Sequence, residues 1–111
     1  MNKVLVTTTK QMNMLSDESF FLDYFLTEEE IVSENGIGIC SYGVEVVLRS
    51  GEVIERKAAP MLSCEKVLVL ELIDALFKNV VTPTTLLDIV SDRMYEWEEE
   101  VYELGNEFII G

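Results

Sequence analysis

Carboxylates are the most abundant side chains in this chain that could do chemistry. The 111 residues include 21 Asp and Glu against eight Lys and Arg, and there is no histidine. Three runs place carboxylates next to one another: Asp17-Glu18, Glu28-Glu29-Glu30 and Glu98-Glu99-Glu100. Such groups are able to exchange protons or to hold magnesium. Charge runs are more often solvated surfaces, and we interpret these runs in that way.

The other components of common catalytic sites are missing from the sequence. Without histidine, the chain lacks the usual general base near neutral pH, and Ser-His-Asp and Cys-His arrangements are excluded. Two cysteines cannot build a four-ligand zinc site alone. There is also no glycine-rich phosphate loop and no calcium-binding loop. We therefore expect a protein that is not an enzyme and that uses no cofactor or metal.

The cysteines and the apolar segments bear on the compartment. Cys40 and Cys64 are isolated, which favours small buried thiols in a reducing environment over a disulfide. The apolar run at the N-terminus is too short for a signal peptide, and no segment reaches the ~20 apolar residues of a membrane span. These observations predict a cytoplasmic protein.

The net charge of −13 limits the classes of partner. Free nucleic acid and anionic membranes would repel such a chain, whereas a basic protein surface would attract it. The charge is unevenly distributed along the sequence. Residues 11–35 and 79–111 each carry a net −7, residues 36–78 carry −1, and residues 1–10 carry +2. We expect a protein partner with a basic surface.

The first half of the chain predicts antiparallel strands. Residues 40–48 alternate apolar and small or polar side chains, and Ser50-Gly51 makes a turn into a second strand of a hairpin. Asn35-Gly36 is a turn signal that joins this hairpin to the aromatic run before it. The expected strands are residues 3–9, at a sheet edge and followed by a loop to residue 19, then 20–26 with an extension to 32, 40–48 and 52–57.

Two helices are predicted after Pro60, which closes the strand region. Ser63 is a suitable N-cap for a helix from Cys64 to about Lys78. Thr82-Pro83 restarts the chain into a second helix that ends near Gly105, and residues 106–111 form a tail. The pattern predicts one α+β domain over residues 1–111. Its antiparallel sheet of three or four strands is followed by two C-terminal helices packed on one face.

The second helix carries the most informative spacing. An apolar stripe of Leu87, Val90, Met94, Trp97, Val101 and Leu104 predicts a buried side. At 100° per residue, an acidic ridge lies on the other side, formed by Asp88, Asp92, Glu96, Glu99 and Glu103. Like charges so placed cost about 0.2–0.5 kcal/mol per pair. The ridge is either a solubilising surface or a recognition surface for a cationic partner.

The function predicted from these features is a non-catalytic protein-binding or regulatory module. The acidic ridge and Trp97 are its predicted partner-binding residues, and the sequence leaves monomer and homodimer equally open. The alternative is an acidic nucleic-acid mimic that inhibits a DNA- or RNA-binding protein such as a nuclease. Because the ridge has only about half to two-thirds of the charge density of a DNA strand, that alternative needs Glu28-Glu29-Glu30 alongside it.

Two short stretches resemble a family of small uncharacterised proteins from Firmicutes. One is Tyr42-Gly43-Val44-Glu45-Val46, which leads into the hairpin, and the other is residues 81–90, which open the last helix. The sequence departs from the family in its acidic extension after Met94. The resemblance implies the fold and a bacterial cytoplasmic origin, and it implies no activity.

Overall fold

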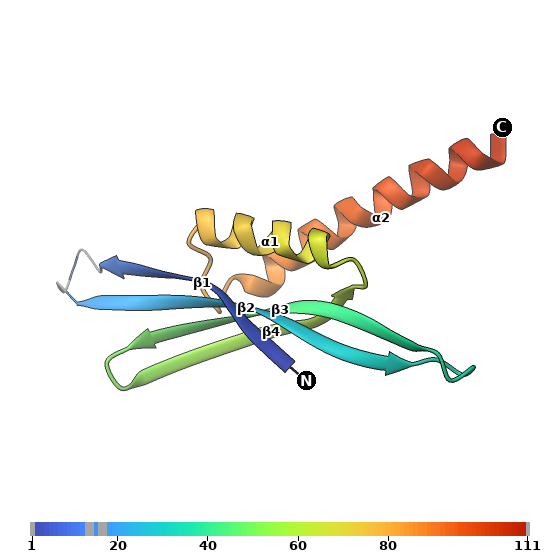
Figure 1. Cartoon of the computed structure of the whole chain (residues 1–111). Helices are drawn as coiled ribbons and strands as arrows, with labels where there is room; N and C mark the ends of the chain where they lie inside the picture. The colour runs from blue at the N-terminus through green and yellow to red at the C-terminus, as the bar shows by residue number, and fades with distance from the viewer. Residues whose placement is uncertain (1, 13–14, 16–17, 111) are drawn as a thin grey trace.

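The protein folds as a four-stranded sheet followed by two helices, as the sequence predicts (Figure 1). The computed structural model describes the backbone of residues 2–12, 15 and 18–110, and the side chains of these residues up to Glu98. The elements are β1 (Asn2–Met12), β2 (Ser19–Val32), β3 (Gly38–Ser50), β4 (Val53–Ser63), α1 (Lys66–Lys78) and α2 (Leu86–Ile110).

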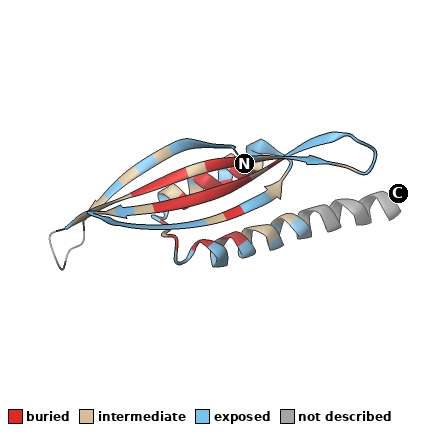
Figure 2. Cartoon of the chain, turned by 90° about the horizontal axis from the view of Figure 1, so that it is seen from below, coloured by how far each residue is buried: buried red, intermediate tan, exposed pale blue. Residues whose placement is uncertain are grey.

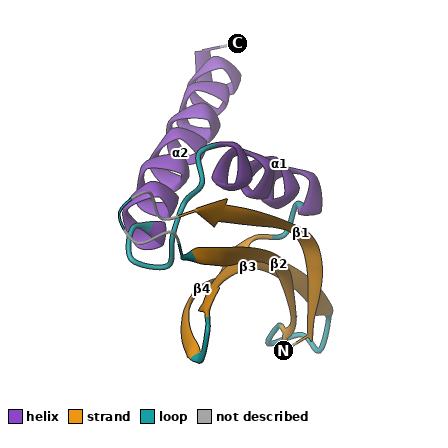
Figure 3. Ribbon diagram, turned by 90° about the vertical axis from the view of Figure 1, so that its left-hand side faces the viewer, coloured by secondary structure: helices purple, strands orange, loops and turns teal. Residues whose placement is uncertain are grey.

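The four strands form one antiparallel sheet in the order in which they occur along the chain, so β1 and β4 are its edges. Tight turns at Gly36 and Gly51 join the later strands, and both glycines have a positive φ that disfavours other residues. Both helices lie on the same face of the sheet (Figure 3). We call the opposite face, which carries no helix, the open face.

The core lies between the sheet and the helices. The even-numbered apolar residues of the β2 aromatic run face α1, and the hydroxyl of Tyr24 donates a hydrogen bond of 2.9 Å to the carbonyl of Val81, between the helices. Figure 2 shows the buried residues concentrated in the middle of the sheet and the start of α2. The core residues are Leu22, Tyr24, Leu26, Val44, Val46, Ala59, Val69, Leu72, Ile73, Leu76, Val81, Leu86 and Val90.

Several predicted boundaries differ from the structure. β4 continues through Pro60 to Ser63, because an edge strand needs no hydrogen bond from its outward N–H groups. α1 begins two residues later than predicted, at Lys66, and α2 begins at Leu86, after a turn at residues 83–85. α2 runs through Gly105 to Ile110, so the predicted cap and residues 106–110 of the predicted tail are helical instead. Helical hydrogen bonding continues past a glycine at a cost of about 1 kcal/mol.

Three predicted burials are wrong. Leu87 is 45% exposed, and Leu86 takes the core position, so the buried stripe of α2 is shifted by one residue. Cys40 and Cys64 are both exposed free thiols. They lie beyond the region that α1 covers: Cys40 is near the start of β3, and Cys64 is in the short connection before α1. Val101 and Leu104 belong to the part of α2 whose side chains lie outside the described residues.

The β3–β4 pairing contains an irregularity at Gly43. Tyr42 and Val44 pair with Ser63 and Ala59, so residues 60–62 of β4 span the single residue Gly43. The backbone of β4 passes so close that a Cβ atom on Gly43 would lie 2.4 Å from the carbonyl oxygen of Ala59. Met61, within this bulge, has a φ of 54°. The bulge sets the direction in which the last residues of β4 leave the sheet.

Candidate functional site

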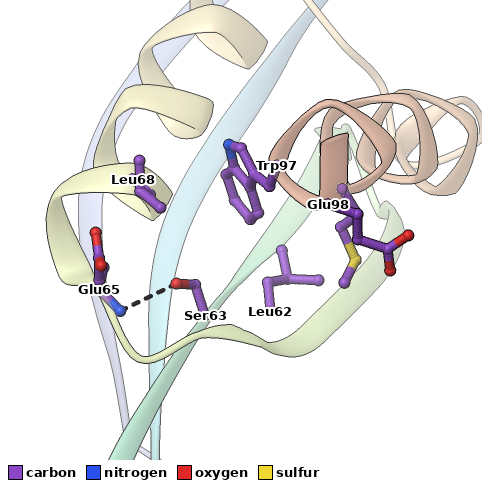
Figure 4. A pocket seen from close by; sticks show the side chains of 7 residues that line it. Leu62, Ser63, Glu65, Leu68, Trp97 and Glu98 are labelled. Carbon is purple, nitrogen blue, oxygen red and sulfur yellow. Dashed lines mark hydrogen bonds between the residues drawn. The ribbon is translucent and has the colours of Figure 1, made fainter. Parts of the chain in front are cut away.

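An open cleft lies where the end of β4, the start of α1 and the middle of α2 meet (Figure 4). Its volume is about 500 Å³. Four apolar side chains provide most of its surface, and two carboxylates and one hydroxyl complete it. The lining residues are Leu62, Leu68, Met94, Trp97, Glu65, Glu98 and Ser63. A cleft of this size with an apolar lining accommodates one or a few apolar side chains of a ligand or partner.

Local features of the chain position the residues on each side of the cleft. The bulge at Gly43 directs β4 so that Leu62 and Ser63 reach the cleft. The Ser63 hydroxyl then accepts a hydrogen bond of 3.0 Å from the backbone N–H of Glu65, just before α1 begins. On α2, Met94 is three residues before Trp97 and four residues before Glu98, so all three line the cleft from one side of the helix.

Beside the cleft, one row of paired residues crosses the sheet from β4 to β2. Glu28 pairs with Tyr42, and Tyr42 pairs with Ser63, so these three residues form one row on the helix side. The Cys40 thiol lies beside this row, and a hydrogen bond with Glu28 raises its pKa. Burial, and then the charge of Glu28, raise the pKa of the Tyr42 phenol. The row brings a third carboxylate, Glu28, to the same region as Glu65 and Glu98.

The cleft combines an apolar surface with acidic groups at its border. Glu65 and Glu98 line the apolar surface, and Glu28 lies in the neighbouring row of the sheet. Lys66 is the base closest in sequence to this part of the fold. Among the described residues, no group of three or more Cys, Asp or Glu is placed to hold a metal ion. An apolar group that carries a positive charge beside it would match both the lining and the charge of the cleft.

The residues predicted to bind a partner lie on two sides of α2. Asp88, Asp92 and Glu96 are exposed, and Arg93 contacts Glu96 at 3.7 Å. Trp97 is nine residues from Asp88, which places it about 180° around the helix, facing the cleft. The side chains of Glu99 and Glu103 lie outside the described residues. The described part of the ridge and Trp97 therefore belong to different surfaces.

The strand register also brings together charged residues that are far apart in the sequence. Half of the chain's eight bases, Lys3, Lys10, Arg49 and Arg56, lie on the open face. Among the described residues, the acids on this face are Asp23, Glu29 and Glu45. Basic side chains cover the rings of Phe21 and Phe25 there, at 4.9–5.8 Å from the ring centroids. Alternation along each strand predicts which of its residues share a face. The register between strands then determines which residues of neighbouring strands lie side by side.

A partly buried ion pair joins β2 to β3 on the open face. The Nε and Nη2 atoms of Arg49 donate hydrogen bonds of 2.6 and 3.0 Å to the Asp23 carboxylate, and the Thr8 hydroxyl donates a third. The Arg49 hydrogen bonds lower the pKa of Asp23, against the effect of burial, and the Thr8 hydrogen bond lowers it further. A second ion pair on this face joins the Lys3 Nζ and the Glu45 Oε2 at 3.2 Å. The charges of Asp23 and Glu45 are therefore each balanced by a base on the same face.

The hydrogen bond between Glu28 and Cys40 can be tested by thiol chemistry. Because the thiolate is the reactive form and the pKa of Cys40 is raised, Cys40 is expected to react with iodoacetamide more slowly at pH 8 than an ordinary exposed thiol. Glu28→Gln is expected to accelerate its alkylation at least about twofold. Peptide mass spectrometry measures both thiols at once, with Cys64 as the internal control. Equal rates at Cys40 in the two proteins would contradict this contact.

The fold and the cleft define a class of small α+β domain in which two helices cover one face of a four-stranded antiparallel sheet. Residues 3–96 match the model of a family of unknown function, DUF6514, and the chain belongs to this family. The match covers the sheet except Asn2, all of α1 and the first part of α2. No curated protein and no solved structure matches the chain. Within the described residues, no helix has the length and apolar character needed to span a bilayer.

Proposed function

We propose that this protein is a non-catalytic protein-binding module, and that its cleft receives an apolar side chain flanked by Lys or Arg from a partner segment. The observation that carries the proposal is the cleft itself, an apolar surface of about 500 Å³ bordered by Glu65 and Glu98. An aromatic side chain at the centre of a cleft is the usual anchor of a protein interface, and Trp97 has that position here.

The charges favour a cationic partner over an anionic one. The protein has a net charge of −13, and Glu28 extends the acidic border along the sheet. Apolar contacts would supply most of the affinity, and the carboxylates would accelerate association and select the partner. The family match includes Leu62, Leu68 and Met94 and ends one residue before Trp97. Most of the cleft therefore lies in the part of the chain that the family model covers.

The nucleic-acid mimic receives less support from this geometry. A mimic requires one continuous acidic surface, and Glu28 lies on the helix side of the sheet, in the row that leads to the cleft. The ridge residue Asp88 lies on the opposite side of α2 from Trp97, which faces the cleft. The two acidic groups therefore point to different sides. We include a cytoplasmic location in the proposal, because two exposed free thiols persist best in a reducing compartment.

A peptide-display selection on the full-length protein tests this function. We expect the selected peptides to share an apolar residue next to Lys or Arg. Leu68→Lys, which places a cation in the cleft, is expected to weaken their binding at least about tenfold, or about 1.4 kcal/mol. Raising the salt concentration should weaken binding further, because salt screens the exposed carboxylates.

Val67→Lys is the matched control for this experiment. Val67 is the neighbouring residue on α1, it is 65% exposed, and it does not line the cleft. The two variants change the net charge equally, so a simple effect of charge would weaken binding in both. Selected peptides that are acidic, or that bind the Leu68→Lys variant as tightly as the wild type, would contradict the proposed function.

A further inference from the structure

The open face and α2 have opposite electrostatic character. In the part of the chain that the structure describes, the open face carries four bases and three acids, although the whole sequence has eight bases and 21 acids. α2 carries eight acids and one base, Arg93, over its 25 residues. The two surfaces lie far apart on one molecule, because the helices cover the other side of the sheet (Figure 3). Within one copy, the bases of the open face therefore cannot pair with the carboxylates of α2.

The shape and composition of the open face are those of a surface that can bind a helix. The sheet curls away from the helices, so that β4 and the N-terminal end of β1 stand on either side of a concave surface (Figure 3). Its centre combines apolar rings with charges, because basic side chains lie over Phe21 and Phe25. Leu5 and Ile54, at its two borders, are 52% and 56% exposed. Lys10 and Arg56 make no ion pair with the described residues.

The last helix is placed so that another molecule can reach it. α2 runs beyond the end of α1 and away from the sheet (Figure 1). Asp88, Asp92 and Glu96 are exposed on the side turned away from the cleft. A helix that leaves its own sheet gains stability when it packs on another surface, because most helical stability comes from tertiary contacts.

We propose that the open face binds the acidic α2 of a second copy of this chain. Because the open face and α2 lie on different sides of each copy, the contact is head-to-tail, and the smallest assembly that it forms is a dimer. Lys10 and Arg56 face the partner's carboxylates, and the partner's helix covers the exposed borders at Leu5 and Ile54. The cleft lies on the other side of the sheet and stays free for the partner segment.

Charge exchange between two variants tests this dimer. One variant reverses the face, with Lys10→Glu and Arg56→Glu, and the other reverses the helix, with Asp92→Lys and Glu96→Lys. Sedimentation at low salt is expected to show a dimer for the wild type and monomers for each variant alone, with dimerisation weakened at least tenfold. An equal mixture of the two variants is expected to recover the dimer mass, because each acidic element then meets a basic one. Lys57→Glu with Lys66→Glu, two bases away from the open face, is the matched control and should leave the dimer intact.

The outcomes that overturn the proposal are equally specific. A monomeric wild type at low salt would overturn it, as would a dimer that survives either reversal or a mixture that stays monomeric. Circular dichroism of each variant establishes that the variant is folded, and recovery in the mixture can come only from folded chains. A wild-type monomer that binds a fluorescent oligothymidine through Lys10 and Arg56 would reassign the open face to single-stranded nucleic acid.

Discussion

Gly43→Ala is expected to destabilise the protein by about 2–3 kcal/mol, the upper part of the range for overpacking a buried site. The added Cβ would lie 2.4 Å from the Ala59 carbonyl oxygen, 2.6 Å from the Pro60 Cα and 2.9 Å from the Met61 nitrogen. All three are backbone atoms, so the contact can be relieved only by moving β4. Urea denaturation measures the loss as a lower midpoint at unchanged slope.

Gly38→Ala provides the matched control for this prediction. It is in the same strand, and its added Cβ would meet only the end of the Glu30 side chain, at 2.5 Å. That side chain can rotate away, so the expected change is within about 0.5 kcal/mol. The Gly43 variant should also lose affinity at the cleft, because the bulge positions Leu62 and Ser63. Equal stability of the two variants would show that β4 does not approach Gly43 as described.

Arg49→Met is expected to lower the free energy of unfolding at neutral pH. It leaves the buried carboxylate of Asp23 with Thr8 as its remaining partner. Loss of one member of a fully buried pair costs about 3–5 kcal/mol, and we expect less here because water already reaches the Arg49 side chain, which is 46% exposed. Chemical denaturation at several pH values measures this difference.

The pH dependence gives the sharper test of this ion pair. The pKa of Asp23 is lowered in the folded protein, so its contribution is fully present above the unfolded value of about 3.9 and is lost as the pH falls through the folded pKa. The difference between wild type and variant should therefore be largest near pH 7 and narrow on acidification. Arg56→Met, on the same face and without an ion pair to the described residues, should show little loss. A pH-independent difference would contradict the pairing.

Local sequence patterns were sufficient to predict the layers of this fold. Alternation in residues 40–48, the turn at Ser50-Gly51 and the helical spacing after Ser63 each indicate one element, and the order of elements indicates two layers. Boundaries depended on tertiary context. Pro60 remains in β4 because that strand is an edge, and Leu86 takes the core position that the stripe assigned to Leu87 because both fit a helical period.

The candidate site was only partly predictable. Trp97 was predicted as a partner-binding residue from its helical spacing, and the structure places it in the cleft. The remaining walls depend on the register of β3 with β4, which the bulge at Gly43 sets and which no local pattern reveals. The open face escaped prediction for the same reason, because Lys10, Arg49 and Arg56 are separated in sequence and meet only through strand pairing.

The most direct test of the cleft as the binding site is an amide and indole NMR titration of the full-length protein with a selected apolar-basic peptide. We expect the indole N–H of Trp97 and the amides of Leu62, Leu68 and Met94 to shift together, with one dissociation constant. Shifts confined to Asp88 and Asp92 or to the open face, with the Trp97 indole unmoved, would contradict it.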